Sequence, residues 1–528
     1  MKLIVAIIIS LMCLFFLAEE VQCARILAVI PTPSYSHNRA FKPLWMELNK
    51  RGHDIVLVTT NPIPNMNTTS FVQIDISKSY GIVDRYNFVQ RRFSKVNWLT
   101  LQKTDIFGLG DNFAHEIYNN SEVRKLYAPD SDAKFDVVMI QAFISPAVFA
   151  LAHRFNAPLI GVVSCGILAV HEHILGGLVL PSHESTWEME GIEGPNLSFW
   201  QRLQNFLNMW NYVFDSYNIL IANQQKIMNQ YLGNDLPSLL DIEKNMSLVF
   251  INQIDAITPA KPRLANMITY TLTYPETNLN QLPEDLERFL DDASEGFIYF
   301  SLGSMILSFQ LPPETIQVLL DVLGRLPYKV VWKYEKQLPR KLDNIFTAPW
   351  FHQPSILAHR KIKLFMYQGG LQSTQEAMHF GVPVLGFPVF SDQMYQAKRM
   401  EALGLGKRMD LTTLNRNDLE AAIREIITNR RYKEKMIEIK NTIEDVPYNS
   451  MEHLAWWTEY VIRHKGVPHL HSSLTRQPWY QRNDMDIIVF LTTVVCILIT
   501  IAIGTIVTLV RFCRRRRSSA ENHKLKVS

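Results

Sequence analysis

The chain has 528 residues, of which 47% are hydrophobic and 20% are charged, and it contains no low-complexity tract. This composition is typical of a folded protein with a large core and excludes a disordered chain. The formal net charge is +3, but the last 18 residues alone carry +6, so the rest of the chain is slightly acidic. The body of the protein therefore lacks the basic surplus expected of a protein that binds nucleic acid.

The first 23 residues have the features of a secretory signal peptide. Lys2 precedes an apolar run from Leu3 to Leu17, and small residues follow near Cys23. The alternative is a buried first helix, but a strand pattern, RILAVI, begins directly afterwards, which favours a signal. We therefore expect residues 1–23 to be removed.

A first α/β domain is predicted for residues 24–260. A strand at 25–30 is followed by a loop at 31–40, a helix near 41–50 and a strand at 54–59. The apolar runs KFDVVMI and PLIGVV predict two more buried strands. Strands that alternate with helices indicate a parallel sheet covered by helices on both faces.

The middle of the chain, residues 185–245, is helical in pattern and rich in aromatic residues. It packs on the core, shapes an apolar pocket or touches a membrane surface, and the pattern leaves these three interpretations open. Residues 261–290 are Pro-rich and polar, which predicts a linker. Alternating strand and helix patterns then resume in a second domain, 291–485. Its strand patterns are GFIYFS, YKVVWKY, KIKLFMY and VPVLGFP. Two such domains suggest a binding cleft between them.

A transmembrane helix is predicted at residues 486–510. Ile487 to Val510 are 24 residues without a charge, enough to span a hydrocarbon core of about 30 Å. The RFCRRRR sequence that follows assigns the tail, 511–528, to the cytosol. The tail ends in KLKVS, which resembles a dilysine retrieval signal of the endoplasmic reticulum, although a solvated basic tail is the alternative. Together with the signal, this predicts a single-pass type I protein of the endoplasmic reticulum membrane whose body is lumenal.

Cysteine usage and glycosylation motifs fit this topology. Of the five cysteines, only Cys165 falls within the predicted lumenal body, so no intrachain disulfide is expected there. Four Asn-X-Ser/Thr motifs are glycosylation candidates, at Asn67, Asn119, Asn196 and Asn245.

Three loops of the second domain follow predicted strands, at residues 301–304, 350–359 and 367–376. Because the carboxyl ends of parallel strands meet at one edge of a sheet, we expect these loops to line one crevice. Trp350, in the second loop, offers a flat apolar face for a base. The crevice is therefore a candidate nucleotide site.

The span QGGLQSTQEAMHF has the form of a phosphate-binding turn that opens a helix. Gly370 opens the turn, Ser373 can donate to phosphate, and Glu376 can reach ribose hydroxyls. The pair Asp392–Gln393, after the next strand, suits a polyhydroxylated ligand. Taken singly, Ser373 is equally well explained as a helix cap and Asp392 as a partner in a salt bridge.

Residues 350–393, WFHQPSILAHRKIKLFMYQGGLQSTQEAMHFGVPVLGFPVFSDQ, resemble the signature of UDP-glycosyltransferases of the glucuronosyltransferase type, most like their insect branch. The resemblance extends from the signal, through Ser-His after the first strand, KFDVV and LPEDLERFLDDASEGFIYFSLGS, to the membrane span and the tail. It implies a GT-B fold of two facing Rossmann-like domains. The first domain would bind a small lipophilic acceptor and the second a UDP-sugar, which is a co-substrate, so that no cofactor is expected.

The resemblance also implies roles for individual residues. His37 matches the general base. The donor contacts that it implies are Ser301 and Ser304 at the diphosphate, Trp350 and Gln353 at the uridine, Gln368, Gly370, Gln372 and Ser373 at the phosphates, Glu376 at the ribose, and Asp392 and Gln393 at the sugar hydroxyls.

A histidine at position 37 suits the reaction that the resemblance implies. An acceptor hydroxyl that attacks the anomeric carbon must lose its proton, and an imidazole with a pKa near about 6.5 is a good base at neutral pH. UDP leaves in a single displacement with inversion, while dipoles around the diphosphate stabilise its charge. The alternative to a catalytic role is that His37 is a loop residue that caps the next helix.

The chain departs from the family pattern in two places. Vertebrate relatives have an aspartate after the FDVV strand that hydrogen-bonds the catalytic histidine, and the matching residue here is Gln141. Asp136 lies at the start of that strand, at the wrong end to substitute. Relatives have Thr-His before the double glycine, where this chain has Tyr367 and Gln368. Gln368 can donate to a phosphate oxygen but cannot become cationic.

A metal-dependent transfer would need a carboxylate pair after an apolar strand. The two Asp-X-Asp sequences, at 130–132 and 484–486, lie before a strand and next to the membrane span, respectively. We therefore expect no essential metal.

Two hypotheses follow. The first is a hexosyltransferase of the conjugation or detoxification type, with UDP-glucose favoured over UDP-glucuronate. A glucuronate site should offer a cation to the sugar carboxylate, and Arg39 is the candidate because it lies near His37 in the sequence. The second is a weakly active or inactive relative that binds UDP-sugars or lipophiles, or regulates active relatives, as Gln141 and Gln368 suggest. The sequence leaves open the acceptor and the formation of homo- or hetero-oligomers.

Overall fold

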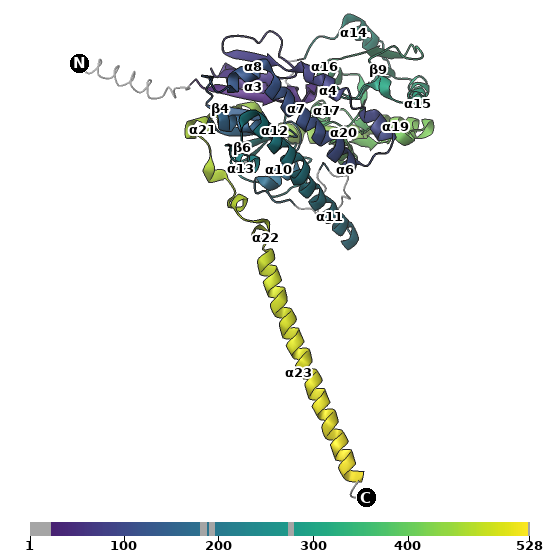
Figure 1. Cartoon of the computed structure of the whole chain (residues 1–528). Coiled ribbons are helices and arrows are strands. Elements are labelled where there is room, and N and C mark those ends of the chain that lie inside the picture. The colour runs from purple at the N-terminus through teal and green to yellow at the C-terminus, as the bar shows by residue number, and fades with distance from the viewer. Residues whose placement is uncertain (1–22, 180–186, 189–195, 273–278, 526–528) are drawn as a thin grey trace, which may run out of the picture. The chain divides into compact units, whose positions relative to one another are not determined.

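A computed structural model describes residues 23–179, 187–188, 196–272 and 279–525 (Figure 1). The chain divides into two units, one up to His471 and one from Ser472 onward. Residues 1–22 of the predicted signal and residues 526–528 of the predicted retrieval sequence lie outside the described residues.

The first unit contains two fully parallel sheets, as expected. The first sheet has seven strands in the order β3-β2-β1-β4-β5-β6-β7. Its strands are rich in Val, Ile and Leu because both faces are covered, and most of their residues are buried. They are β1 (Arg25–Ile30), β2 (Asp54–Thr59), β3 (Phe71–Asp75), β4 (Val137–Gln141), β5 (Leu159–Val163), β6 (Leu248–Asn252) and β7 (Met267–Tyr270).

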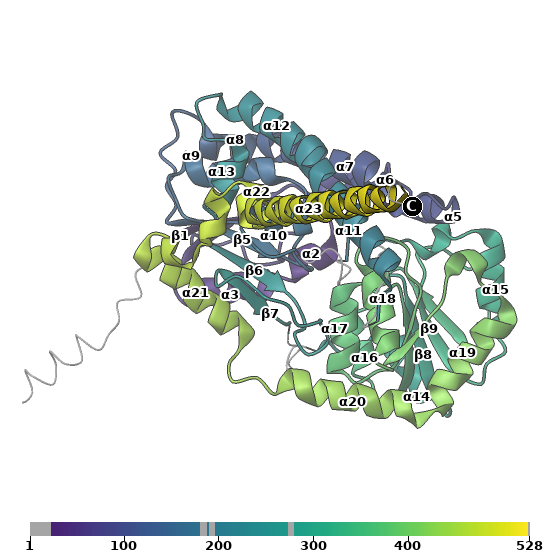
Figure 2. The ribbon, with the colours of Figure 1, turned by 90° about the horizontal axis from the view of Figure 1, so that it is seen from below.

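Helices lie on both faces of this sheet (Figure 2). The helices of this half are α2 (Tyr35–Arg39), α3 (Lys42–Lys50), α4 (Tyr80–Val83), α5 (Phe88–Phe93), α6 (Trp98–Leu101), α7 (Phe107–Asn119), α8 (Ser121–Tyr127), α9 (Ala150–Arg154), α10 (Ala169–Ile174), α11 (Phe199–Asp215), α12 (Ala222–Leu232) and α13 (Leu239–Lys244).

The prediction of a loop at residues 31–40 is wrong in part, because α2 occupies its second half. Ser34 is the extended residue before the helix, which runs for only five residues. A single turn of this length is too short for a helical period to show in the sequence. The consequence is that His37 lies on a helix at the carboxyl end of β1.

The second sheet has six strands in the order β10-β9-β8-β11-β12-β13. These are β8 (Phe297–Ser301), β9 (Lys329–Lys333), β10 (Ile345–Ala348), β11 (Ile362–Tyr367), β12 (Val384–Gly386) and β13 (Gly406–Arg408). The sheet lies between helices on its two faces (Figure 2). The helices of this half are α14 (Glu284–Asp291), α15 (Pro313–Leu323), α16 (Gln353–Leu357), α17 (Leu371–His379), α18 (Gln393–Ala402), α19 (Arg416–Thr428), α20 (Arg430–Glu444) and α21 (Ser450–His464).

The predicted linker at 261–290 is not irregular throughout. Its first part contains β7, the edge strand of the first sheet, and its end contains most of α14. An edge strand has one open side, and only Met267 and Tyr270 of β7 are buried. Two buried residues among prolines and polar residues are too few to reveal a strand in the sequence.

The end of the first unit returns to the first sheet. Leu454 and Val461 of α21 join the same buried core as Leu44 and Trp45 of α3. The Glu459 carboxylate of α21 also accepts a hydrogen bond from Arg51, at 3.2 Å. The first sheet is therefore completed by residues that follow the second sheet in the sequence.

The aromatic helix α11 begins with a capping box formed by Ser198 and Gln201. Tyr212 on one of its faces is buried, whereas Trp200 and Phe214 are exposed. The helix thus packs on the core and also presents an apolar face outward.

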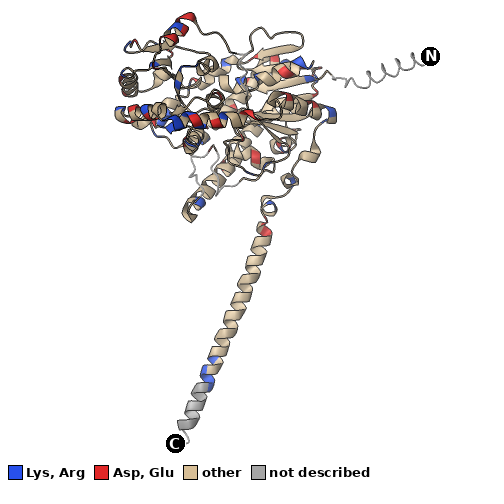
Figure 3. Cartoon of the chain, turned by 180° about the vertical axis from the view of Figure 1, so that it is seen from behind, with Lys and Arg blue, Asp and Glu red and all other residues tan. Residues whose placement is uncertain are grey.

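The second unit contains α22 (Trp479–Arg482) and α23 (Met485–Leu525). Among the described residues, α23 is the helix that is long and apolar enough to cross a membrane. Charged residues lie only near its two ends (Figure 3), and none occurs between Asp486 and Arg511. The predicted span at 486–510 therefore falls within one continuous helix.

Candidate active site

One cavity in the first unit lies where the carboxyl ends of both sheets meet. All three loops predicted to converge line it, and so does His37 from the first sheet. Its lining includes each donor-contact residue that the resemblance implies, namely Ser301, Ser304, Trp350, Gln353, Gln368, Gly370, Gln372, Ser373, Glu376, Asp392 and Gln393. The residues are brought together as expected, while their individual roles remain predictions.

The double glycine shapes the turn before α17. Gly369 has φ +90°, and a Cβ at this position would lie 2.6 Å from the main-chain oxygen of Gln393. Glycine is therefore required here, because a larger residue would be strained and would push the Asp392–Gln393 loop away. The turn leaves the amino end of α17 facing the cavity, where helix N–H groups favour an anion such as phosphate.

Glu376, the candidate ribose ligand, has polar partners on both of its oxygens. Arg39 Nη1 lies 2.7 Å from its Oε1, and Gln353 Nε2 donates to its Oε2 at 2.5 Å. Burial raises the pKa of Glu376, and Arg39 opposes that shift. Arg39 comes from α2, so this ion pair joins the two sheets across the cavity.

Trp350, the candidate base-stacking residue, is half-exposed on the cavity wall. Tyr35 of α2 contacts it edge-on, with ring centroids 4.9 Å apart. Lys333 Nζ lies 5.7 Å from its ring centroid and pairs with Glu335 at 2.5 Å. One ring face can stack on a base, and Tyr35 narrows the entrance.

Asp392 and Gln393 have structural partners that the sequence did not indicate. Asp392 Oδ2 accepts from the Leu371 N–H at 3.3 Å, and Gln393 Oε1 accepts from the Val389 N–H at 2.9 Å. Burial raises the pKa of Asp392 to about 6. The Gln393 oxygen thus holds its own loop, which leaves the Gln393 amide N–H groups and Asp392 Oδ1 for a sugar.

Gln368 lies beside the phosphate turn, at the position where the resemblance implies a histidine. It is nine-tenths buried, and its amide oxygen accepts no hydrogen bond from any described residue. A Cβ on Gly303 would lie 2.2 Å from its Nε2, so the side chain crosses closely over the turn after β8. Gln368 therefore brings unused hydrogen-bonding capacity to the phosphate region.

His37 is partly buried and contacts two polar side chains at the ends of neighbouring strands. Its Nδ1 lies 2.7 Å from Gln141 Nε2 at the end of β4 and 2.8 Å from Ser164 Oγ just after β5. Burial lowers the pKa of His37 to about 4, so the imidazole is neutral at neutral pH. Asp136 lies at the other end of β4, as predicted. There its carboxylate accepts a hydrogen bond from the Arg25 N–H at 2.7 Å.

Apolar and aromatic side chains of the first half line the cavity beyond His37. The His37 and Phe143 rings lie 5.4 Å apart. The others are Val83, Phe88, Trp98, Ile106, Phe107, Leu109, Phe113, Ile144, Leu168, Trp187 and Tyr212. This wall suits a lipophilic molecule, and Tyr212 shows that α11 contributes to it.

No group of three or more His, Cys, Asp or Glu side chains gathers within the described ranges. Asp130 and Asp132 precede β4, and Asp484 and Asp486 flank the start of α23. Neither pair is at the cavity, and independence from metal remains a prediction.

Sequence reasoning missed two contributors to this site. Ser164 directly follows β5, so the rule that located the other loops at the carboxyl ends of strands would have found it. The pairing of Arg39 with Glu376 joins residues more than 300 positions apart, and no local pattern signals it. Arg39, the candidate cation for a sugar carboxylate, contacts the candidate ribose ligand Glu376, and its role toward a sugar remains a prediction.

Sequence comparison identifies relatives over almost the whole chain. Residues 25–519 match the family described as "UDP-glucoronosyl and UDP-glucosyl transferase". A UDP-glycosyltransferase of the insect Dactylopius coccus, UGT5, is 29% identical over 92% of this chain and 93% of its own. An ecdysteroid UDP-glucosyltransferase of Mamestra brassicae nuclear polyhedrosis virus is 30% identical over 87% and 88%. Human UDP-glucuronosyltransferase 2B15 is 26% identical over 94% of each chain.

Two solved glycosyltransferases have the same architecture. The calicheamicin glycosyltransferase CalG4 superposes with a TM-score of 0.53 at 18% identity, covering 84% of this chain and 99% of its own. Glycosyltransferase VinC, solved with DTDP, has a TM-score of 0.55 at 14% identity, covering 84% and 100%. The fold is therefore GT-B, and the chain belongs to the UDP-glucuronosyl and UDP-glucosyl transferase family of hexosyltransferases.

Proposed function

We propose that the chain transfers glucose from UDP-glucose to a hydroxyl of a small lipophilic acceptor, with inversion at the anomeric carbon. The observation that carries this proposal is that one cavity holds His37, an apolar wall and all the donor-contact candidates. UDP-glucuronate is the second candidate donor.

The geometry supports a single displacement. The acceptor oxygen bonds to the anomeric carbon while its proton passes to Nε2 of His37, and the bond from that carbon to the phosphate oxygen breaks. UDP leaves with the electron pair, and the amino end of α17 stabilises its charge.

The charges in the cavity support glucose over glucuronate. Among the described lining residues, the Arg and Lys side chains are Arg39 and Lys333, and they pair with Glu376 and Glu335. Asp392, at the predicted sugar end, would repel a sugar carboxylate when ionised. A neutral hexose avoids this repulsion.

Donor preference is measured with membranes that express the full chain, incubated with UDP-glucose and UDP-glucuronate in parallel and with simple phenols as acceptors. We expect kcat/KM to favour UDP-glucose by at least about tenfold. An Arg39→Gln variant should change KM for both donors similarly, because Arg39 lies at the ribose ligand. A selective loss of UDP-glucuronate transfer in that variant would assign Arg39 to the sugar carboxylate. A native kcat/KM that is equal or higher with UDP-glucuronate would contradict the glucose preference.

The pH dependence should separate two groups. His37 stays neutral above its pKa of about 4, so kcat should be nearly flat between about pH 5 and about pH 8. Asp392 has a pKa of about 6, so it becomes protonated as the pH falls, and KM for the donor should rise about tenfold at about pH 5. In Asp392→Asn the donor KM should be high at every pH. A donor KM in the native chain that stays constant through about pH 6 would exclude the role of Asp392.

We also propose that the protein is a type I protein of the endoplasmic reticulum membrane, anchored by α23, with the first unit lumenal and active in conjugation or detoxification. The basic residues after Val510 and the predicted signal support this orientation. Asn67, Asn119, Asn196 and Asn245 are all exposed, as glycosylation requires.

The alternative of a weakly active relative has one observation in its favour. Gln141, which replaces an aspartate, places an amide nitrogen at Nδ1 of His37. Measurable UDP-sugar binding without product from either donor would favour this alternative.

A further inference from the structure

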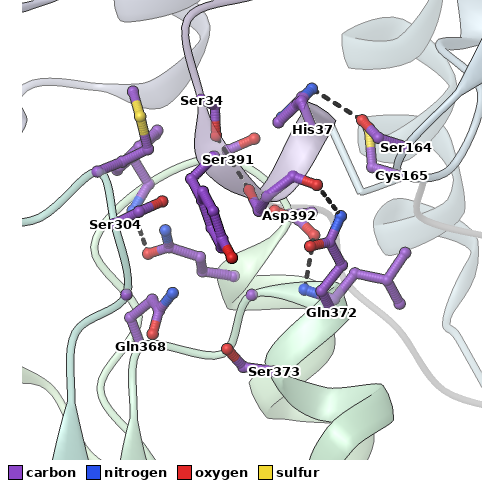
Figure 4. Close-up of a pocket in the computed structure, with 18 of the residues that line it drawn as sticks. Ser34, His37, Ser164, Cys165, Ser304, Gln368, Gln372, Ser373, Ser391 and Asp392 are labelled. Atoms are coloured by element: carbon purple, nitrogen blue, oxygen red, sulfur yellow. Dashed lines mark hydrogen bonds between the residues drawn. The ribbon is translucent and has the colours of Figure 1, made fainter. Parts of the chain in front are cut away.

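The ring of His37 contacts an amide NH₂ group and a hydroxyl group. The hydroxyl oxygen can accept a hydrogen bond, whereas the NH₂ group can only donate one. Figure 4 shows the contact between His37 and Ser164. Gln141 Nε2 and Ser164 Oγ lie 2.7 and 2.8 Å from Nδ1, respectively, and both side chains are almost fully buried. These contacts leave Nε2 of the ring for the acceptor.

Transfer requires one tautomer of the neutral imidazole. Nε2 can take a proton from the acceptor hydroxyl only if the proton of the neutral ring sits on Nδ1. A proton on Nδ1 needs a hydrogen-bond acceptor there. Without such an acceptor the proton favours Nε2, and the base is lost.

Gln141 does not supply that acceptor in the orientation observed. Its amide oxygen accepts from the Thr32 N–H at 3.4 Å, which turns its NH₂ group toward the ring. Flipping the Gln141 amide would bring its NH₂ group close to the Thr32 N–H. Two buried hydrogen-bond donors would then face each other, which is unfavourable. A donor at Nδ1 stabilises the unproductive tautomer.

We propose that Ser164 is a positioning residue for the transfer reaction, whose hydroxyl oxygen accepts a hydrogen bond from Nδ1–H of His37 and so keeps Nε2 free to act as the base. This inference rests on the proposed function. It assigns to a hydroxyl after β5 the task that a carboxylate after β4 performs in vertebrate relatives.

The same hydroxyl can satisfy Gln141. Gln141 Nε2 lies 3.5 Å from Ser164 Oγ, and a hydroxyl oxygen has two lone pairs. Ser164 can therefore accept from His37 and from Gln141 together. This arrangement requires the Gln141 NH₂ group, which lies 2.7 Å from Nδ1 in the structure, to move away from the ring toward Ser164. A neutral hydroxyl cannot balance the imidazolium charge as a carboxylate does, so the native chain should be slower than one with an acid at position 141.

A double-mutant cycle tests this role. It compares four full-length proteins in membranes, namely the native chain, Ser164→Ala, Gln141→Asp and the double variant. We expect Ser164→Ala to lower kcat about 10- to 100-fold with KM for UDP-glucose unchanged, because only the tautomer is lost. Gln141→Asp should raise kcat. In the Gln141→Asp background, Ser164→Ala should change kcat by less than about threefold, because the carboxylate now accepts the hydrogen bond from Nδ1–H.

Ser164→Thr is the matched control, since it keeps the hydroxyl and should retain kcat. UDP binding by the same membranes reports folding, and Ser164→Cys, which is similar in size and a poor acceptor, replaces Ser164→Ala if that variant binds no UDP. Equal losses of kcat in both backgrounds would show a packing role and overturn the inference, as would an unchanged kcat in Ser164→Ala. A native chain without transfer from any donor would instead overturn the proposed function and this inference with it.

Discussion

Replacing His37 with alanine is expected to abolish sugar transfer while UDP binding remains. His37 lies at the carboxyl end of β1 with its Nδ1 bound, and the candidate donor contacts come from the second sheet. Loss of a general base typically costs about 10²- to 10⁴-fold in rate. The measurement is product formation from UDP-glucose and a phenol, with UDP affinity measured on the same membranes.

His469→Ala is the control for this substitution. His469 is exposed and does not line the cavity, so its loss should leave the rate unchanged. Turnover by His37→Ala close to that of His469→Ala would refute the assigned base.

Replacing Gly369 with alanine is expected to cost both donor binding and stability. Positive φ and a contact of 2.6 Å with the Gln393 oxygen combine at this residue. The strain alone is worth about 1–3 kcal/mol, and relieving the contact would move the loop that carries Asp392. We expect KM for UDP-glucose to rise more than about tenfold, which corresponds to about 1.4 kcal/mol.

Gly233→Ala separates the backbone strain from the contact. Gly233 has φ +91°, but a Cβ there would meet nothing within 4 Å. It should lower the thermal unfolding temperature and leave the donor KM unchanged. If both variants raise KM alike, or neither does, the close approach of Gly369 to the Asp392–Gln393 loop has no part in donor binding.

The sequence predicted the features that depend on regular patterns. Continuous apolar runs such as KFDVVMI indicated buried parallel strands, and the rule that loops meet at the carboxyl ends of strands brought Ser301, Trp350 and Gly370 to one cavity. The resemblance added residue roles that no pattern could supply.

What the sequence did not predict depends on short elements or on contacts between distant residues. α2 and β7 are too short to show a period. The Arg39–Glu376 ion pair depends on how the two sheets face each other. Ser164 follows β5, so its place at the edge of the sheet was predictable, but a serine after a strand has no distinctive neighbours, and its role is visible only from its distance to His37.

The return of α21 to the first sheet has a consequence for biosynthesis. The strands of this sheet are complete at Tyr270, but the core between the sheet and α3 also needs residues up to Val467, about 200 residues later. At about 5–20 residues per second, translation of that segment takes roughly 10–40 s. During this interval an apolar face of the first half remains exposed. A chain that stops before residue 450 would expose that face permanently. Chaperones of the folding compartment should therefore bind nascent chains that end between the two sheets.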